Sequence, residues 1–224
     1  MITKVFIGVP TSDGVRCPVF YDYMQNMDKP EGTIGKSFHT NSGAFNRNLI
    51  INEALGTECS HILFVDDDMG FPNHALTQLL AADKDIVSGL FLKRTYPHPP
   101  VIFNFEDGKY VRRLLRDNEK GLLEVDATGF GFTLVRTRVF NLLERPYIRL
   151  GEFRPDRRSE DIGFCKRARA AGFRIYCDLD LPIGHIGLAT YWPHNIGGVW
   201  HTAIDTDGDE VINVVQPQSI LVET

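Results

Sequence analysis

The sequence predicts an α/β fold, with a mixed central sheet flanked by helices and followed by a C-terminal hairpin. Three observations support this prediction. Short apolar runs typical of buried strands occur at 4–9, 61–65 and 85–92, and segments with helical periodicity lie between them. These helical segments carry their own start and stop signals. The chain has 224 residues, enough to bury a full core. Strand–helix alternation of this kind favours a sheet with helices on both faces.

The first half of the chain supplies most of this alternation. Residues 13–38 are polar and interrupted by glycines, and we expect only a short helix near 18–27. Ser42 is a suitable N-cap for a helix that ends at Gly56, because its hydroxyl can accept a hydrogen bond from a free backbone N–H. After the strand at 61–65, a second helix is expected from Pro72 to about Ala82.

The second half reads as a series of strands with two helices. Asp107-Gly108 is a typical two-residue hairpin turn between strands at 101–105 and 110–115. A second acidic Asp-Gly turn, at 207–208, is expected between strands at 203–204 and 211–215. We prefer this hairpin to a calcium loop, which needs glycine at its sixth position. The other expected elements are strands at 122–128, 132–135 and 173–177, and helices at 137–143 and 162–171.

Composition narrows the class of protein. The net charge is −5, so there is no basic excess of the kind that typifies nucleic-acid-binding domains. The cysteines are far apart and include no CxxC pair, which indicates buried free thiols rather than a disulfide framework or a zinc site. No signal peptide or membrane-spanning apolar stretch is visible, and we expect a cytoplasmic protein. The four cysteines are Cys17, Cys59, Cys165 and Cys177.

The most informative motif is the acidic run that follows the strand at 61–65. Asp66, Asp67 and Asp68 would lie at the carboxyl edge of a sheet, where open α/β folds bind ligands. Closely packed carboxylates repel one another and attract a cation. Mg²⁺ is often held by one or two carboxylates together with substrate phosphates. The run therefore predicts a metal–diphosphate site, with a solvated acidic turn as the alternative.

Other short motifs accompany this run in a recognisable order. Taken together, they resemble the GT-A glycosyltransferases, especially small single-domain members of the family 2 type, over roughly residues 2–187. The motifs are Val9-Pro10-Thr11, Asn46-Arg47-Asn48, the acidic run, Ser159-Glu160-Asp161 and Gly184-His185-Ile186-Gly187.

This resemblance implies a Rossmann-like domain at 1–190, with a nucleotide-binding half (about 1–95) and an acceptor half (96–190). The remaining residues, 191–224, would be a loop and hairpin packed on the same domain. Trp192, His194, Trp200 and His201 would belong to that loop, either as ordinary packing or as part of a lid over the donor sugar.

The resemblance also assigns roles at the metal site. Asp68 would ligate Mn²⁺ or Mg²⁺, and His185 would complete the metal shell, because neutral imidazole is a good ligand for such ions. Asp66 would face the ribose or a metal-bound water, and Asp67 would help to orient the nucleotide. On its own, a single histidine after a strand is more often structural than a ligand.

Catalytic and nucleotide-binding roles follow in the same way. Asp161 would be the base that removes the acceptor proton, and Glu160 would position the acceptor or the base. Two acidic residues at a helix start are also favourable on purely structural grounds. Arg47 would contact the nucleotide base, although a surface salt bridge is the alternative. Thr11 would lie near the uracil and ribose, and Gly129 beneath the donor sugar and the acceptor. Lys93 and Arg94 would contact the diphosphate or the acceptor. The family's acidic uracil contact has no clear counterpart among Asp13, Asp22 and Asp28.

The implied activity is a metal-dependent, hexosyltransferase-like transfer of sugar from a nucleotide diphosphate, with UDP-sugars as the expected donors, to a hydroxyl group. Inversion is favoured because a base is present and no nucleophile is evident. One alternative is a sugar-nucleotide pyrophosphorylase, but residues 8–12 lack the Gly-rich loop with Arg and Lys. Another is a non-catalytic nucleotide-sugar binding module.

The acceptor is left open by the sequence. It could be a glycan, a lipid-linked sugar, a protein side chain, a small molecule or a hydroxylated base in DNA. A basic face for DNA would have to come from two arginine clusters, Arg112, Arg113 and Arg116, and Arg154, Arg157 and Arg158.

Overall fold

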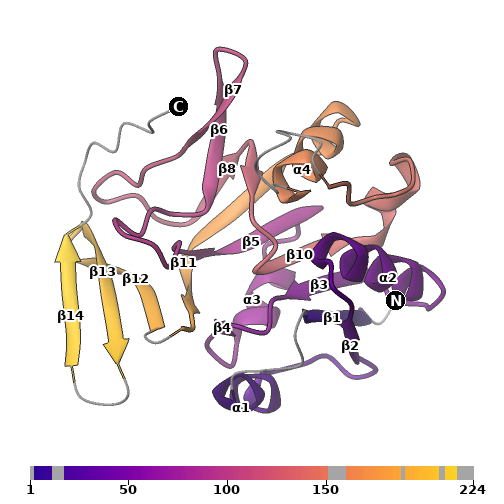
Figure 1. Ribbon diagram of the computed structural model, residues 1–224, viewed down its shortest axis with the longest axis horizontal. Helices are drawn as coiled ribbons and strands as arrows, with labels where there is room; N and C mark the ends of the chain where they lie inside the picture. The colour runs from indigo at the N-terminus through magenta and orange to yellow at the C-terminus, as the bar shows by residue number, and fades with distance from the viewer. Residues whose placement is uncertain (1–2, 12–17, 151–159, 188–189, 207–209, 216–224) are drawn as a thin grey trace.

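The centre of the fold is a mixed sheet, which Figure 1 shows crossing the middle of the molecule. The computed structural model describes residues 3–11, 18–150, 160–187, 190–206 and 210–215. Within them, the sheet has 11 strands, in the order β14-β13-β12-β11-β5-β10-β3-β1-β2, with β4 and β8 also paired to β11. A second sheet of three strands has the order β7-β6-β9. The predicted mixed α/β architecture is therefore confirmed.

The N-terminal strands form a parallel group. β1 (Val5–Thr11) lies between β2 (Ile34–His39) and β3 (His61–Val65) and runs parallel to both. The strands at 4–9 and 61–65 were predicted, but β2 was not. β2 is an edge strand with mostly exposed side chains, so it lacks the alternation of apolar and polar residues that marks a half-buried strand.

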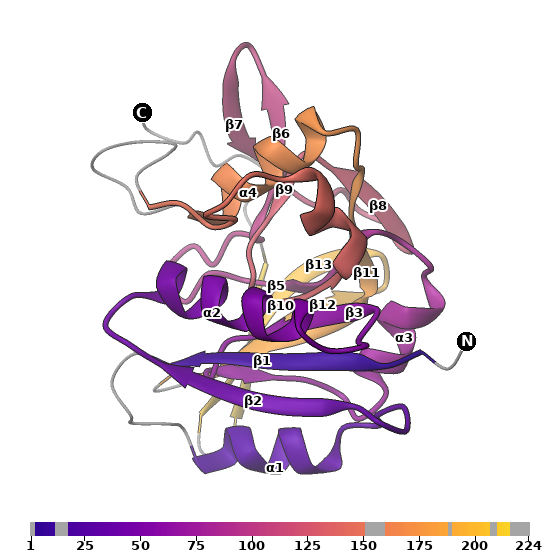
Figure 2. The ribbon, with the colours of Figure 1, turned by 90° about the vertical axis from the view of Figure 1, so that its right-hand side faces the viewer.

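Helices cover both faces of this part of the sheet, as Figure 2 shows for α2 above and α1 below. Alternate residues of β1 point to opposite faces. Val5, Ile7 and Val9 pack with α1 (Pro18–Asn26) and α3 (Ala75–Ala81), whereas Phe6 packs with α2 (Gly43–Leu55). Gly8 allows α2 to approach closely, because a Cβ there would meet Ile50 at 2.2 Å.

The helix ends follow the sequence signals closely. Ser42 caps α2, its hydroxyl accepting a hydrogen bond from the Phe45 N–H at 3.3 Å, and Gly56 follows the last turn as predicted. α3 begins at Ala75, later than the predicted start at Pro72. The expected helix at 137–143 is a 3₁₀ helix, η1 (Thr137–Leu142). α4 (Glu160–Ala170) begins slightly before the predicted span.

The middle of the sheet is formed by three strands from distant parts of the chain. β10 (Phe132–Arg136) is antiparallel to both β3 and β5 (Ile86–Phe91), and β11 (Ile175–His185) is parallel to β5. β11 is much longer than the strand predicted at 173–177. It extends through Gly184 and His185, which the sequence pattern placed after a strand.

One predicted strand is divided between the two sheets. The segment expected as a single strand at 122–128 forms β8 (Leu122–Val125), which pairs with β11, and β9 (Ala127–Thr128), which pairs with β6 (Ile102–Glu106). The predicted hairpin is confirmed, because β6 pairs with β7 (Lys109–Arg112). Asp107 and Gly108 both have positive φ, as a tight two-residue hairpin turn requires.

The C-terminal strands extend the sheet outward (Figure 1, yellow). β12 (Thr190–Ile196), β13 (Val199–Thr206) and β14 (Glu210–Val215) form an antiparallel series. Trp192 and His194 therefore lie in β12, and Trp200 and His201 in β13, rather than in a loop. The strands at 203–204 and 211–215 were predicted, and the turn at 207–208 lies outside the described residues.

Two further expectations concern the cysteines and membrane-spanning helices. Cys59, Cys165 and Cys177 are buried and free, as predicted, whereas Cys17 lies outside the described residues. Among the described helices, none is both long enough and apolar enough to cross a bilayer.

Candidate active site

The acidic run lies where β3 ends, at the edge of the sheet. The three aspartates line an open pocket of about 160 Å³ with Pro10, Thr11, Gly43, Asn46 and Arg47. The Asp66 N–H donates to the Gly131 carbonyl at 2.9 Å, which holds the start of the run against the segment before β10. The predicted proximity of Thr11, Arg47 and the acidic run is therefore present in the folded chain.

Arg47 connects the acidic run to the start of α4. Its guanidinium donates to Asp66 Oδ1 at 2.7 Å through Nη2 and to Glu160 Oε1 at 2.8 Å through Nη1. Asp161 Oδ1 lies 3.7 Å from the same Nη1. Burial alone would lower the pKa of Arg47, but the three carboxylates together raise it above its usual value. Arg47 is thus a buried cation shared by three acids.

Asp161 is held in a setting that favours its protonated form. Burial, the largest cause, and the charges of Glu160 and Asp66 together raise its pKa to about 7, against the attraction of Arg47. The Phe130 N–H donates to Asp161 Oδ2 at 3.3 Å. Oδ1 is buried and has no hydrogen-bond partner within the described part of the chain. A carboxyl group that titrates near neutrality suits acid–base chemistry.

The pKa values of Asp66 and Asp68 are shifted in opposite directions. Burial raises the pKa of Asp66, although the nearby Arg47 opposes this effect. Burial also acts to raise the pKa of Asp68, but contacts with His185 and Arg94 hold it below its usual value. The structure therefore favours the ionised form of Asp68.

A short strand brings His185 to Asp68. β4 (Met69–Gly70) pairs with the end of β11, so that Met69 lies opposite His185. The Ile186 N–H donates to the Asp68 carbonyl at 2.7 Å. His185 Nε2 then lies 3.4 Å from Asp68 Oδ2. Residues separated by more than a hundred positions in the chain are thereby brought together, as the resemblance implied.

The contact of His185 Nδ1 with the Leu92 carbonyl shows which ring nitrogen is the donor. Nδ1 lies 2.8 Å from the Leu92 carbonyl, which can only accept a hydrogen bond, so we assign the proton to Nδ1. When Nε2 also carries a proton, that proton faces the Asp68 carboxylate and lowers the pKa of Asp68. In the neutral ring, the Nε2 lone pair faces the carboxylate instead. Two acceptors this close call for a cation or a proton between them. A histidine that donates its second N–H to a carbonyl is also the usual arrangement in metal sites.

These contacts fit a divalent cation only in part. Within the described ranges, no three His, Cys, Asp or Glu side chains are grouped as a metal-binding set. Asp68 and His185 provide two ligands of suitable type, and Asp66 is turned to Arg47. Mg²⁺-like ions commonly take their remaining ligands from water and substrate phosphates. The residues present fit a cation that is completed by a bound diphosphate.

Thr11 and Asn46 also line the small pocket. The Asn46 side-chain amide donates to the Thr11 carbonyl at 2.9 Å. Thr11 Oγ1 and Asn46 Oδ1 are buried and without partners in the part of the chain that the structure describes. Asn46 belongs to the Asn46-Arg47-Asn48 motif, but it was given no role of its own among the predicted site residues.

Of the remaining predicted residues, Gly129 and Arg94 adjoin this centre through the contacts below, whereas Lys93 is not among the residues that line the pocket. Gly129 precedes Phe130, whose ring lies 5.6 Å from the Arg47 guanidinium carbon and whose N–H contacts Asp161. Arg94 Nη1 lies 3.2 Å from Asp68 Oδ2. Lys93 is exposed, and its backbone carbonyl contacts His98. The roles of Phe130 and the Leu92 carbonyl were not predicted, because only the folded chain shows their contacts.

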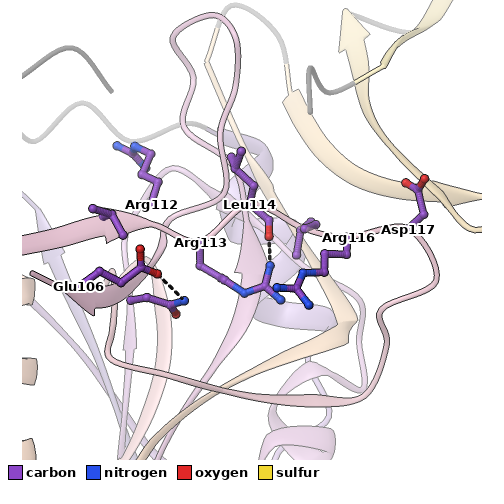
Figure 3. Close-up of a pocket in the computed structure, with 9 residues that line it drawn as sticks. Glu106, Arg112, Arg113, Leu114, Arg116 and Asp117 are labelled. Atoms are coloured by element: carbon purple, nitrogen blue, oxygen red, sulfur yellow. Dashed lines mark hydrogen bonds between the residues drawn. The ribbon is translucent and has the colours of Figure 1, made fainter. Parts of the chain in front are cut away.

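A second pocket, of about 500 Å³, lies beside the β6–β7 hairpin and is lined in part by Arg112, Arg113 and Arg116 (Figure 3). Figure 3 shows the guanidinium groups of Arg113 and Arg116 pointing toward each other. Arg113 is paired with Glu119, and Glu106 and Asp117 also line the pocket. Its charge is therefore mixed. The second predicted cluster, Arg154, Arg157 and Arg158, lies outside the described residues.

Comparison with known proteins identifies the fold. No family model and no curated protein matches the chain. A197 from STIV is similar over 95% of this chain and 98% of its own length, with a TM-score of 0.63 and 16% identity. TarS of S. aureus matches 80% of this chain with a TM-score of 0.50 and 15% identity, and TarS 1–349 in complex with UDP-GlcNAc matches 79% with the same score and identity.

The chain spans nearly all of A197, but 35% of TarS and 56% of TarS 1–349. At these identities, the similarity concerns the fold alone. The central mixed sheet with flanking helices is GT-A-like, and the predicted fold class is confirmed.

Proposed function

We propose that this protein is a metal-dependent glycosyltransferase that moves a sugar from a nucleotide diphosphate to a hydroxyl acceptor with inversion. The observation that carries the proposal is that Arg47 contacts two carboxylates for which we propose different roles. Asp66, in the acidic run, and Asp161, at the start of α4, both lie against its guanidinium. The acidic run, at one end of this arrangement, suits a diphosphate and its cation. Asp161, at the other end, suits a base that accepts the proton of the acceptor hydroxyl.

The donor end is formed by Asp68 and His185. These two side chains would hold Mn²⁺ or Mg²⁺, which would supply a Lewis acid to stabilise the charge on the departing nucleoside diphosphate. Asp68 is kept ionised, and the Leu92 carbonyl orients His185. The unpartnered oxygens of Thr11 and Asn46 support binding of the nucleoside along the pocket wall.

The acceptor end is formed by Asp161. Its pKa of about 7 lets it lose its proton near neutral pH and then accept one from the attacking hydroxyl. Arg47 and the Phe130 N–H hold the carboxyl group in place, and Glu160 shares the Arg47 charge. Because a base is present and the described site has no separate nucleophile aligned for a covalent intermediate, a single inverting displacement is favoured.

Incubation with nucleotide sugars and Mn²⁺ tests this function before the acceptor is known. UDP-sugars come first, because a protein of similar fold, TarS 1–349, was crystallised with UDP-GlcNAc. Slow release of free UDP, dependent on Mn²⁺ and lost in Asp68→Ala, would support a transferase. Formation of nucleoside triphosphate from nucleotide sugar and pyrophosphate would instead support a pyrophosphorylase. Binding without turnover, with any acceptor class, would favour a binding module.

A further inference from the structure

Among the described residues, two charged or titratable side chains lie close to Asp68 Oδ2, and only one of them, His185, is an expected metal ligand. His185 Nε2 lies 3.4 Å away, and Arg94 Nη1 lies 3.2 Å away. Arg94 Nη1 also donates to the Ile186 carbonyl at 3.0 Å. Because the Ile186 N–H is itself bonded to the Asp68 carbonyl, Arg94 is fixed to the same junction of β4 and β11 that brings His185 into place.

This position conflicts with cation binding at Asp68. The guanidinium lies 3.2 Å from the carboxylate oxygen that a metal ion would bind, and it has only donors, so it cannot itself serve as a ligand. It also places a full positive charge beside the cation's expected position. Arg94 and a divalent cation therefore compete for Asp68. The Arg94 side chain is 47% exposed, so leaving this position breaks contacts that water can replace.

We propose that Arg94 is an exchangeable counterion, which neutralises Asp68 in the ligand-free protein and moves to the donor diphosphate when a divalent cation takes its place. This inference rests on the proposed function. Arginine suits both positions, because its planar fork binds carboxylates and phosphates with similar geometry. The segment after β5 carries Arg94 beside the acidic run, so the side chain can reach either partner without a change of fold.

The proposal has a measurable thermodynamic consequence. A cation that arrives alone must displace Arg94 and leave it without a partner, whereas a cation that arrives with a diphosphate supplies one. Mn²⁺ and UDP should therefore each strengthen the binding of the other by the same factor. Arg94 should account for much of this coupling, because it is the group that opposes the metal in the absence of the nucleotide.

Titration calorimetry with Mn²⁺ and UDP tests this on the full chain. Arg94→Gln should bind Mn²⁺ alone about tenfold more tightly than the wild type, and the mutual enhancement by UDP should shrink by a similar factor. Arg138→Gln is the matched control. Arg138 is also an exposed arginine paired with an aspartate, Asp85, but it lies outside the site, so its loss should change neither quantity.

The outcomes separate this inference from the proposed function. Unchanged or weaker Mn²⁺ binding in Arg94→Gln, in a protein whose Mn²⁺ binding is lost in Asp68→Ala, would overturn the counterion role and leave the metal site in place. Mn²⁺ binding that survives in Asp68→Ala would overturn the metal site, and the counterion role with it. Tighter binding in Arg94→Gln that Asp68→Ala abolishes would support both.

Discussion

Arg47 donates a hydrogen bond to Glu160 at 2.8 Å and so joins two helices whose contact residues are 113 positions apart. The other arm of the same guanidinium holds Asp66 at 2.7 Å. The acidic run after β3 and the acidic start of α4 are therefore fixed relative to each other by a single side chain. This relationship makes Arg47 a positioning residue for both ends of the site, in addition to any contact with a nucleotide.

Loss of Arg47 should destabilise the whole protein. Arg47→Met would leave Asp66 and Glu160 without their shared cation, and its own side chain is only 8% exposed. Breaking a buried ion pair from one side typically costs about 3–5 kcal/mol. Urea unfolding would measure this loss. Arg138→Met, which removes an exposed pair, should cost much less, and equal losses in the two variants would contradict the account.

Asp68 and His185 should differ in their importance for metal-dependent binding. Asp68→Ala should abolish the Mn²⁺-dependent part of UDP affinity, because Asp68 is the proposed ionised ligand. His185→Ala should weaken it less, because a water molecule can take the histidine's place. Calorimetry with and without Mn²⁺ would compare them, with Asp85→Ala as a control away from the site. Unchanged affinity in Asp68→Ala would remove the basis for the metal site.

Asp161 should affect sugar transfer and not donor binding. Asp161→Asn keeps the size of the side chain but cannot accept a proton from the acceptor, so transfer should fall by about 10²–10⁴-fold. UDP and Mn²⁺ affinity should be retained. Glu160→Gln should lose less activity if Asp161 is the base. A product that retains the anomeric configuration of the donor would also argue against this role, since direct displacement must invert.

The pKa of Asp161 predicts how activity and stability depend on pH. Transfer should rise as pH passes about 7, when the carboxyl group loses its proton. The folded protein binds this proton more tightly than the unfolded chain, so its contribution to stability is complete below about pH 4 and is lost as pH rises through about 7.

Asp161→Asn should remove this dependence. In urea unfolding, its free energy of unfolding relative to the wild type should increase between pH 5 and pH 8, on the order of a few kcal/mol. A difference that stays constant over this range would mean that Asp161 titrates near its usual pKa in the folded protein.

Unmodified duplex DNA should not bind tightly. The net charge is −5, and the described arginine pocket contains acidic residues beside its basic ones. A gel-shift titration at two salt concentrations would test this, because phosphate contacts weaken steeply as salt rises. Submicromolar binding that disappears at higher salt would make a hydroxylated DNA base the leading acceptor.

The sequence by itself determined the local elements and the position of the acidic run at the end of a buried strand. The helix between Ser42 and Gly56 and the turn at Asp107-Gly108 depend on residues close together in the chain, so their signals are visible without a fold. The same is true of the carboxylates that follow a buried strand. The motif order, through the family resemblance, also pointed to Arg47, Glu160, Asp161 and His185, but not to how they contact one another.

Those contacts were decided only by the tertiary structure. Pairing of β4 with β11 sets His185 against Asp68, and the position of α2 over β1 directs Arg47 toward Asp66 and Glu160. The edge strand β2 and the division of residues 122–128 between two sheets were likewise invisible in the sequence. Strand pairing and ion pairing across a hundred residues leave no local pattern, because their free energy comes from partners that only the folded chain brings within reach.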